Sequence, residues 1–505
     1  MKLSRLLSGL PPDLCRLVRP TPASPDPDIS ALAYDSRTVR PGTLFFALPG
    51  ARLDGAAFVP DALARGAAAI LHAPPAWPAP PAVPAAELLA PSPRLAMGLL
   101  ADAFHARPSA ALRLYGITGT NGKTTTTFLL RALLRAAGRP AGLLGTVLYD
   151  VGDPAPVPAD RTMPEAPDTH ALLARARQNG LADVAMEVSS QGLAAERAAG
   201  LRFAALGFTH LTGDHLDFHH TMEAYFQAKR RLFAELAPAA PALLNHRCPY
   251  ARRLRQELAE RSPARTLWTF ALDDPSATLS ASRLRPSPSG TTFDLHTPAG
   301  DASDLHLPLP GRYNVENLLL AFGLALLAQA PFAPMAAAVS SLQGAPGRMQ
   351  LVPDPDPARA LRCFVDYAHT DDALRNVLAT LRPSTTGRLW VVFGCGGDRD
   401  PTKRPRMGAV AAELADVAIL TSDNPRSEPP DAILRDILAG TSTPSARATI
   451  LTEPDRAAAI ALALRSRAPG DTLLVAGKGH ETGQLAHGIL TPFDDASVLH
   501  NLLRA

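Results

Sequence analysis

Apolar and polar positions alternate most regularly in the last third of the chain, from about residue 346 onward. Short apolar runs predict buried strands there, at 361–365, 389–393, 417–420, 449–451 and 472–475. Segments of helical periodicity lie between them and predict helices at 372–381, 404–414, 430–438 and 455–465. Strands that alternate with helices in this way form a mostly parallel, doubly wound sheet. We therefore predict a Rossmann-like α/β domain over residues 346–505.

The first 345 residues divide into two further units. Residues 1–108 contain short strand candidates and two helical segments, which is typical of a small α/β domain; the strands are expected at 31–34, 43–48 and 67–71. Residues 109–345 contain longer buried strands, at 112–117, 183–188 and 204–211. Because 505 residues are too many for one core, we predict three α/β domains: 1–108, 109–345 with a mostly parallel sheet, and 346–505.

The stretch from Leu112 to Ala137 has the plan of a phosphate-binding loop. An apolar strand leads into small residues, and a helix with apolar periodicity follows them. Glycines let backbone N–H groups approach a phosphate, and a helix N-terminus supplies further donors. We expect Lys123 to reach the terminal phosphates and the Thr124 hydroxyl to help hold Mg²⁺. Ile117 stands where the usual loop has its first glycine, so this loop is a variant.

Lysine is rare in this chain. Lysine and arginine together number 50, yet only five of them are lysine. A chain so biased toward arginine is expected to keep lysine where a guanidinium cannot do the chemistry. The phosphate loop explains Lys123, and Lys229, Lys403 and Lys478 become candidates for functional roles. Chance retention at the surface is the alternative, which we accept for Lys2 and leave open for Lys403.

Polar residues that could hold Mg²⁺ and adenine follow in the central unit. Glu187 ends a buried strand, where NTPases place a carboxylate beside Mg²⁺. Acids and imidazoles are dense in 214–220, which suggests a metal; Mg²⁺ is favoured over zinc, because no cysteine joins them. Asn314 and Asn317 share one face of a predicted helix and could contact an adenine edge. A helix-capping role is the alternative for Asn314.

Four polar clusters follow strands of the predicted C-terminal sheet, at 366–369, 394–400, 423–426 and 477–481. Ligands of doubly wound sheets bind at the carboxyl ends of the strands, so we expect these clusters to form one site. The glycines at 394–397 lack the dinucleotide-binding spacing, and His480-Glu481 lacks the second histidine of a zinc-protease motif.

Charge and apolar patterning exclude several classes of protein. A formal net charge of +3 gives no field for nucleic acid. The four cysteines show no pairing or metal spacing, which suits the cytoplasm. The N-terminus lacks a signal-peptide pattern, and the longest apolar stretch, 318–339, is interrupted by Gln329, Pro331 and Pro334, so we expect no membrane span. We expect a cytoplasmic protein that acts as a monomer.

Together these motifs resemble the Mur ligase family over nearly the whole chain. The resemblance rests on DSR at Asp35, TGTNGKTT at Thr118, MEVSS at Met186, DHLDFH at Asp214, AK at Ala228, GRYNVEN at Gly311, GRM at Gly347, DYAHT at Asp366, GCGGDRD at Gly394, DNPR at Asp423 and GKGHE at Gly477. It implies a UDP-binding domain, a central ATPase domain and a C-terminal Rossmann-like domain. It also implies an ADP-forming ligase of peptidoglycan synthesis, which uses ATP and Mg²⁺ and forms an acyl phosphate before amide-bond formation.

The resemblance carries site residues over to this chain. It implies that ATP contacts Gly119, Thr120, Asn121, Gly122, Lys123, Thr124, Thr125 and Asn314. Mg²⁺ would be held by Thr124, Glu187 and His215, which together with Lys123 and Lys229 would form the catalytic set. Lys229 matches a lysine that the family carbamylates to N6-carboxylysine, an anion that arginine cannot form. The UDP-linked substrate would contact Tyr34, Ser36, Thr162, Met163, Ser189 and Arg197.

The DNPR motif indicates which amino acid is added. Arg426 can bind a carboxylate with two hydrogen bonds, and meso-diaminopimelate has a carboxylate at its far end where lysine has only an ammonium. The motif resembles the branch that adds meso-diaminopimelate to UDP-N-acetylmuramoyl-L-alanyl-D-glutamate. The acceptor would also contact Arg399, Asp423, Asn424, Pro425, Gly477 and Glu481.

The sequence departs from the family pattern at three positions and leaves alternatives open. Met163, Asp371 and Gln350 stand where the family usually has Thr, Pro and Glu, so one hydroxyl contact to the UDP substrate is missing at Met163. The alternatives are the same ligase using L-lysine, another ligase of the superfamily such as a folylpolyglutamate synthetase, and a P-loop switch that performs no ligation.

Overall fold

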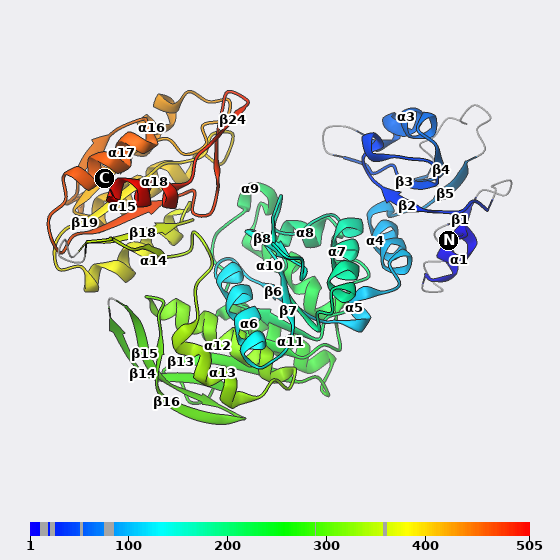
Figure 1. Cartoon of the computed structure of the whole chain (residues 1–505), viewed down its shortest axis with the longest axis horizontal. Helices are drawn as coiled ribbons and strands as arrows, with labels where there is room; N and C mark the ends of the chain where they lie inside the picture. The colour runs from blue at the N-terminus through cyan, green and yellow to red at the C-terminus, as the bar shows by residue number, and fades with distance from the viewer. Residues whose placement is uncertain are drawn as a thin grey trace.

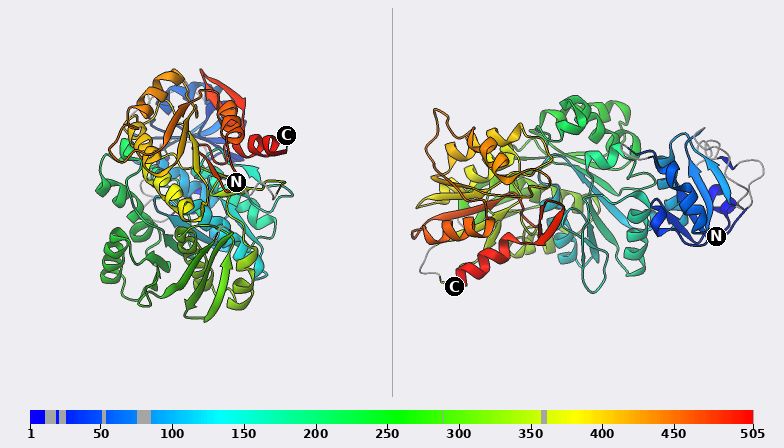
Figure 2. Two further views of the ribbon diagram at one scale, coloured as in Figure 1. Left: turned by 90° about the vertical axis from the view of Figure 1, so that its left-hand side faces the viewer. Right: turned by 90° about the horizontal axis from the view of Figure 1, so that it is seen from above.

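The computed structural model describes residues 1–10, 19–20, 26–50, 54–74, 85–287, 289–356 and 361–504. Cys15 lies outside these ranges. The described strands form three large sheets and one hairpin, and each sheet belongs to a different third of the chain (Figure 1). Seen from above, the central body lies between the N-terminal and C-terminal bodies (Figure 2). The three-domain α/β architecture is confirmed, and the boundaries at 108 and 345 stay predictions.

The N-terminal sheet is parallel apart from one short edge strand. Its order is β1 (Arg19–Pro20), β5 (Ala86–Leu89), β4 (Ala67–His72), β3 (Thr43–Phe46) and β2 (Ala31–Ala33), with β1 antiparallel to β5. The helices are α1 (Leu3–Ser8), η1 (Ser36–Thr38), η2 (Gly55–Phe58), α3 (Val59–Ala64) and α4 (Pro93–Phe104). The three predicted strands are present. At Gly98 of α4 a Cβ would lie 2.5 Å from the Ala199 Cβ, so this domain packs tightly against the central one.

The central sheet has a parallel core with antiparallel strands at both edges. Its order is β16 (Gly300–Leu307), β15 (Gly290–Thr297), β14 (Leu279–Ser287), β13 (Leu267–Leu272), β12 (Ala242–Asn245), β11 (Ala205–Phe208), β6 (Arg113–Thr118), β10 (Asp183–Glu187), β7 (Ala141–Leu144), β8 (Leu148–Asp150) and β9 (Val157–Pro158). The strands β6, β7 and β10 to β14 run parallel. Because β6 lies between β10 and β11, the loop after β6 opens at the carboxyl edge of the core.

Helices cover both faces of the central sheet. They are α5 (Pro108–Ala111), α6 (Lys123–Ala136), α7 (Ala166–Gln178), α8 (Ser190–Ala194), α9 (Leu216–His219), α10 (Met222–Arg231), η3 (Leu232–Leu236), α11 (Pro249–Arg261), α12 (Arg312–Leu327), α13 (Phe332–Ala338) and η4 (Val339–Ser341). The apolar stretch 318–339 contains the C-terminal part of α12 and the whole of α13. Both helices pack in the core beside α6. In the described residues, no helix is long and apolar enough to cross a membrane.

The C-terminal sheet has the predicted doubly wound form. Its order is β17 (Gln350–Val352), β18 (Arg362–Asp366), β22 (Thr472–Ala476), β19 (Leu389–Phe393), β20 (Val417–Leu420) and β21 (Thr449–Thr452), and only β17 is antiparallel. Its helices are α14 (Asp371–Leu381), η6 (Arg382–Ser384), α15 (Lys403–Leu414), α16 (Pro430–Leu438), α17 (Arg456–Arg465) and α18 (Asp495–Arg504). The hairpin β23 (Gly483–Ala486) and β24 (Ile489–Pro492) was not predicted.

A buried ion pair joins α17 to the start of α18. Arg456 and Asp495 have fully buried side chains and share two hydrogen bonds of 2.7 Å. Removing one partner of such a pair leaves an uncompensated buried charge, which typically costs about 3–5 kcal/mol. We expect Arg456→Met to lower the free energy of unfolding of this domain by about that amount, measured by denaturant unfolding of the full chain.

The control for this prediction is an ion pair at the surface of the same domain. Arg375 and Glu413 lie 2.9 Å apart, and their side chains are 47% and 35% exposed. Water solvates both charges, so Arg375→Met is expected to cost under about 1 kcal/mol. Equal losses in the two variants would contradict the assignment of the Arg456 pair as a stabilising contact.

Candidate active site

The phosphate loop is closed tightly by residues from neighbouring strands and helices. Gly119 and Gly122 have φ angles of 140° and 86°, which favour glycine. A Cβ on Gly119 would lie 1.9 Å from Thr209 Oγ1, and one on Gly122 would lie 2.3 Å from Asn317 Oδ1. Any side chain at either position would therefore displace the loop, which explains the glycine requirement of this variant sequence.

Lys123 is the first residue of α6, and its side chain folds back onto the phosphate loop. Its Nζ donates to the carbonyl oxygens of Gly119 at 3.1 Å and Thr120 at 2.7 Å. Burial lowers the pKa of this ammonium, and the nearby charges of Glu187 and Asp214 oppose that shift. The amine is thus held at the loop and borders the same cavity as Thr124 and Glu187, as expected for a group that meets phosphate.

Glu187 is held by two threonines at the end of β10. Thr124 Oγ1 donates to Glu187 Oε2 at 3.0 Å. Thr146 donates its N–H to Glu187 Oε1 at 2.8 Å and its hydroxyl to Oε2 at 3.1 Å. Hydroxyl and carboxylate oxygens are the donors that Mg²⁺ prefers, so the residues present fit this ion. Sequence reasoning missed Thr146, although it follows a strand of the same sheet as the phosphate loop.

Lys229 lies beneath the phosphate loop, on α10. It is 1% exposed, and its Nζ donates to the Gly119 carbonyl at 2.8 Å and lies 4.6 Å from the centre of the Tyr225 ring. Burial, and then the charge of Lys123, lower its pKa well below the usual range. α10 ends at Arg231, and a π-helical turn follows it.

The histidines of residues 214–220 contact different neighbouring side chains. His215 has a φ of 54°, and its ring lies beside Tyr225. His219 Nε2 lies 2.9 Å from Ser190 Oγ. Within the ranges described above, no three His, Cys, Asp or Glu side chains are gathered to hold a metal ion. His215 instead borders the same cavity as Thr124 and Glu187.

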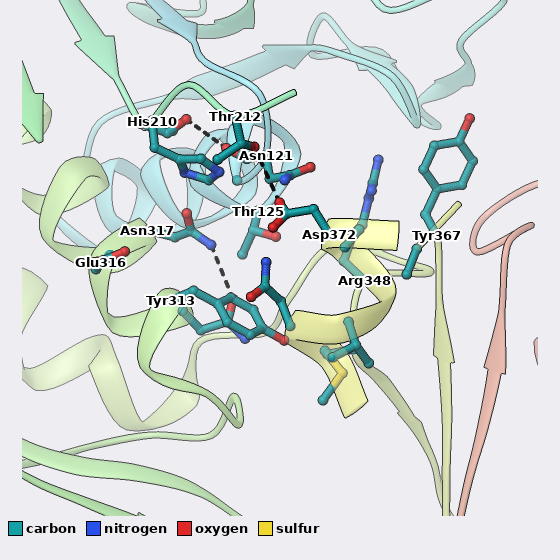
Figure 3. Close-up of a pocket in the computed structure, with 18 of the residues that line it drawn as sticks. Asn121, Thr125, His210, Thr212, Tyr313, Glu316, Asn317, Arg348, Tyr367 and Asp372 are labelled. Carbon is teal, nitrogen blue, oxygen red and sulfur yellow. Dashed lines mark hydrogen bonds between the residues drawn. The ribbon is translucent and has the colours of Figure 1, made fainter. Parts of the chain in front are cut away.

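A cavity of about 390 Å³ separates the phosphate loop from the C-terminal domain. Asn121 and Asn317 border it on the central side, and Arg348, Tyr367 and Asp372 border it on the other (Figure 3). Asp372 accepts a 3.3 Å hydrogen bond from Thr212 across this junction. The space joins the amide groups of Asn314 and Asn317 to the phosphate loop, an arrangement that could receive an adenine edge.

Asn314 and Asn317 lie on one face of α12, as the spacing predicted. Asn317 Nδ2 donates to Asn314 Oδ1 at 3.3 Å, and both residues border the cavity. Asn314 Nδ2 also donates to the Pro310 carbonyl at 2.7 Å. The helix begins at Arg312 with Gly311 as its cap, so the capping alternative for Asn314 is wrong.

A second cavity, of about 530 Å³, continues from the phosphate loop toward the N-terminal domain. It is bordered by four of the residues expected to contact the UDP-linked substrate: Thr162, Met163, Ser189 and Arg197. Arg197 is held in place by Glu165 Oε1 at 2.8 Å and the Met163 carbonyl at 3.2 Å. Tyr34 and Ser36 are not brought to this lining; the Tyr34 hydroxyl donates to Asp168 on α7 at 2.5 Å.

A third cavity, of about 630 Å³, opens at the carboxyl edge of the C-terminal sheet. It gathers six of the seven predicted acceptor contacts: Arg399, Asp423, Asn424, Arg426, Gly477 and Glu481. Pro425 is not part of the lining. Arg426 has a φ of 52°, and its Nη1 donates to the Gly397 carbonyl at 2.7 Å. These six residues include two guanidinium groups and two carboxylates, which suit a zwitterionic amino acid.

The second and third cavities adjoin, because they share seven lining residues: Gln191, Asp214, His215, Tyr367, His369, Arg399 and Glu481. A phosphate loop that adjoins a charged cavity of the next domain is the arrangement expected of one class of protein, the ATP-dependent ligases that activate a carboxylate for attack by an amine. This arrangement argues against a P-loop switch, which has no need of an acceptor cavity.

Comparison with known proteins identifies the family. Profiles described as "Mur ligase family, catalytic domain", "Mur ligase middle domain" and "Mur ligase, glutamate ligase domain" match residues 28–105, 117–325 and 347–479. The chain therefore belongs to the Mur ligase family of ATP-dependent ligases.

Relatives that match nearly the whole chain support this family assignment. A UDP-N-acetylmuramoyl-L-alanyl-D-glutamate--2,6-diaminopimelate ligase from Synechococcus sp. (strain WH7803) is 45% identical over 94% of this chain and 95% of its own. The ligase of that name from Geobacillus kaustophilus (strain HTA426) is 42% identical over 99% of this chain and 98% of its own. A solved structure of such a ligase is 32% identical, with a TM-score of 0.66 over 94% of this chain and 95% of that one. MurF from Acinetobacter baumannii, 19% identical with a TM-score of 0.65, shares the fold and covers 94% of both chains.

Proposed function

We propose that this chain is the ATP-dependent ligase that adds meso-diaminopimelate to UDP-N-acetylmuramoyl-L-alanyl-D-glutamate during peptidoglycan precursor synthesis. The observation that carries this proposal is the acceptor cavity, where Arg426 and Arg399 lie beside Asp423 and Glu481 and open toward the phosphate loop. The names of relatives at 42–45% identity support the same substrates. L-Lysine has no second carboxylate for Arg426, which disfavours it as the acceptor.

The reaction has two steps, and the residues of the cleft suit both. A carboxylate oxygen of the UDP-linked substrate takes the γ-phosphoryl group of ATP, and ADP leaves. The amine of the acceptor then attacks the carbonyl carbon of the acyl phosphate, loses a proton and expels inorganic phosphate. Both steps gather negative charge on phosphate oxygens, so stabilisation comes mainly from positioned cations and N–H donors.

We assign the nucleotide contacts to the phosphate loop and the helix faces beside it: Gly119, Thr120, Asn121, Gly122, Lys123, Thr124, Thr125 and Asn314. Thr124, Glu187 and His215 would hold Mg²⁺, which neutralises phosphate charge when bound. Thr162, Met163, Ser189 and Arg197 would meet the UDP-linked substrate in the second cavity. Tyr34 and Ser36 would contact it from the N-terminal domain.

We place the reaction in the cytoplasm, because ATP and nucleotide-linked precursors are available there. The free, buried thiols of Cys248, Cys363 and Cys395 suit a reducing compartment. The monomeric state stays a prediction.

The test of the proposed function is phosphate release with ATP, Mg²⁺ and the UDP-linked dipeptide, run in parallel with meso-diaminopimelate, L-lysine or no amino acid. Products are weighed by mass spectrometry. We expect release and a tripeptide mass only with diaminopimelate. Turnover with lysine would leave the ligase assignment intact and remove the assignment of Arg426. Phosphate release at the same rate with and without an amino acid would favour a nucleotide switch.

Replacing Arg426 is expected to weaken use of the acceptor selectively. A hydrogen bond to a charged group contributes about 1.5–3 kcal/mol, so Arg426→Ala should raise the KM for diaminopimelate by roughly 10²-fold. The KM for ATP should change by under about threefold, since Arg426 borders only the acceptor cavity. Steady-state kinetics with each substrate varied in turn measures both constants. Arg435→Ala, on the exposed face of α16, is the control, and equal losses for ATP and acceptor would contradict the assignment.

A further inference from the structure

Lys478 is a rare lysine to which the proposed reaction gives no role. It follows β22 and its side chain is 0% exposed, although it sits at the carboxyl edge of the sheet, where ligands bind. Its Nζ donates to Asn424 Oδ1 at 3.1 Å and to Glu481 Oε2 at 3.0 Å. Both partners border the acceptor cavity, whereas Lys478 itself lies behind its wall.

The three side chains form a closed triangle. Asn424 Nδ2 donates to the same Glu481 Oε2 at 2.7 Å, so one carboxylate oxygen receives both a charged and a neutral donor. The backbone N–H of Leu485 also donates to Asn424 Oδ1 at 2.9 Å. Asn424 therefore keeps a hydrogen bond that fixes its orientation without Lys478. The side chain that depends most on the lysine for its orientation is Glu481. The Glu481 side chain is 32% exposed and borders both the acceptor cavity and the phosphate-loop cavity.

Lys478 stands between two glycines in a turn that favours glycine at both positions. Gly477 and Gly479 have φ angles of 112° and 54°. A Cβ on Gly477 would lie 2.5 Å from Asp423 Oδ2, and one on Gly479 would lie 2.7 Å from the Gly347 carbonyl oxygen. A planar guanidinium is broader and is committed to a fork geometry, whereas an ammonium can aim separate donors at two acceptors. Its two separate acceptors, Asn424 and Glu481, give a reason for the lysine in a chain that otherwise favours arginine.

We propose that Lys478 is a positioning residue for the acceptor: it holds the Glu481 carboxylate in one orientation, as the anion that receives an ammonium group of the incoming amino acid. This inference rests on the proposed function. Lys478 touches no reacting atom; it acts through Glu481.

If only the charge of Lys478 mattered, removing it would change acceptor binding in the opposite direction. Lys478 repels any ammonium that enters the cavity, so removing its charge would tighten acceptor binding if repulsion were its main effect. Loss of the hydrogen-bonded cation would instead leave Glu481 held by the neutral Asn424 amide only. The bond from Lys478 to Glu481 joins two charged groups, whereas the bond from Asn424 has only one charged partner, so we expect the loss of position to dominate. The direction of change in the acceptor KM therefore separates the two explanations.

The test compares Lys478→Met and Lys478→Gln with the wild-type chain. We expect Lys478→Met to raise the KM for diaminopimelate by roughly 10–100-fold, the range expected for losing a charged hydrogen bond. The KM for ATP, and the affinity for ADP measured by calorimetry, should change by under about threefold. Lys478→Gln restores a neutral donor and is expected to recover part of the acceptor KM, which a merely structural role would not predict.

The control is Arg382→Met, which removes an ion pair to Asp416 in the same domain, away from the residues that border the cavity. Unfolding midpoints of all variants show whether the domain is intact, and Lys478→Gln keeps the test available if Lys478→Met does not fold. An acceptor KM that is unchanged or lower in Lys478→Met would overturn the inference, as would equal losses for ATP and acceptor. If the wild type uses lysine, the choice of diaminopimelate as acceptor fails while the ligase assignment stands, and the same comparison is made with lysine, which also carries two ammonium groups.

Discussion

Replacement of Lys123 by alanine is expected to lower kcat by about 10²–10³-fold, the range found when one positioned donor to a developing oxyanion is removed. Lys123 Nζ is fixed by the carbonyl oxygens of Gly119 and Thr120, at the point where the loop opens into the substrate cavity. Transfer of the γ-phosphoryl group gathers charge on oxygens that this ammonium would meet. Alanine has no group that reaches this cavity, where Lys123 lies beside Thr124 and Glu187, and a neutral water molecule would supply no positive charge there.

The measurement is single-turnover phosphate release at saturating ATP and UDP-linked dipeptide, together with calorimetric binding of ADP. ADP lacks the γ-phosphate, so its affinity should fall much less than kcat. Lys123→Arg retains the charge but cannot fit the same two carbonyl oxygens, and it should recover little activity. A variant that keeps more than about a tenth of the wild-type rate would show that Lys123 is not the main cation at the transferred group.

Much of this site could be predicted because its residues stand at strand ends. In a parallel sheet the carboxyl ends of the strands meet at one edge, so Glu187 and Asp423 could be placed from apolar runs and turns alone. The register confirms the first case, since Glu187 pairs with Ile117 at the mouth of the phosphate loop. Local patterning also predicted four helices of the C-terminal domain, α14 to α17, to within one residue, whereas α18 was not predicted.

Contacts between distant segments could not be predicted in the same way. Thr146 binds Glu187 only because β7 and β10 are neighbours, and a lone threonine after a short strand carries no signal of that. The environment of Lys229 depends on how α10 packs beneath β6. Tyr34 was assigned to the substrate by resemblance, yet it contacts Asp168, because the packing of two domains sets its partner.

Lys229 is expected to be carbamylated, and its loss should be nearly as damaging as that of Lys123. Burial and the neighbouring Lys123 lower its pKa well below the usual range, which increases the fraction of neutral amine. A neutral amine attacks CO₂ to give a carbamate and a proton. The product is an anion beside Lys123, so repulsion between two cations becomes attraction. Lys229→Arg and Lys229→Met should each lower kcat by about 10²–10³-fold, because neither side chain forms a carbamate.

The decisive measurement is ¹³C NMR of the chain equilibrated with ¹³C-bicarbonate. A carbamate carbonyl signal should be present in the wild type and absent in Lys229→Met, while Lys2→Met, at an exposed lysine, should retain it. Carbamylation needs the neutral amine, so the signal and the activity should both fall as pH is lowered through the depressed pKa of Lys229. Full activity in CO₂-free buffer without the signal would contradict carbamylation and leave Lys229 as a buried amine that braces the Gly119 carbonyl.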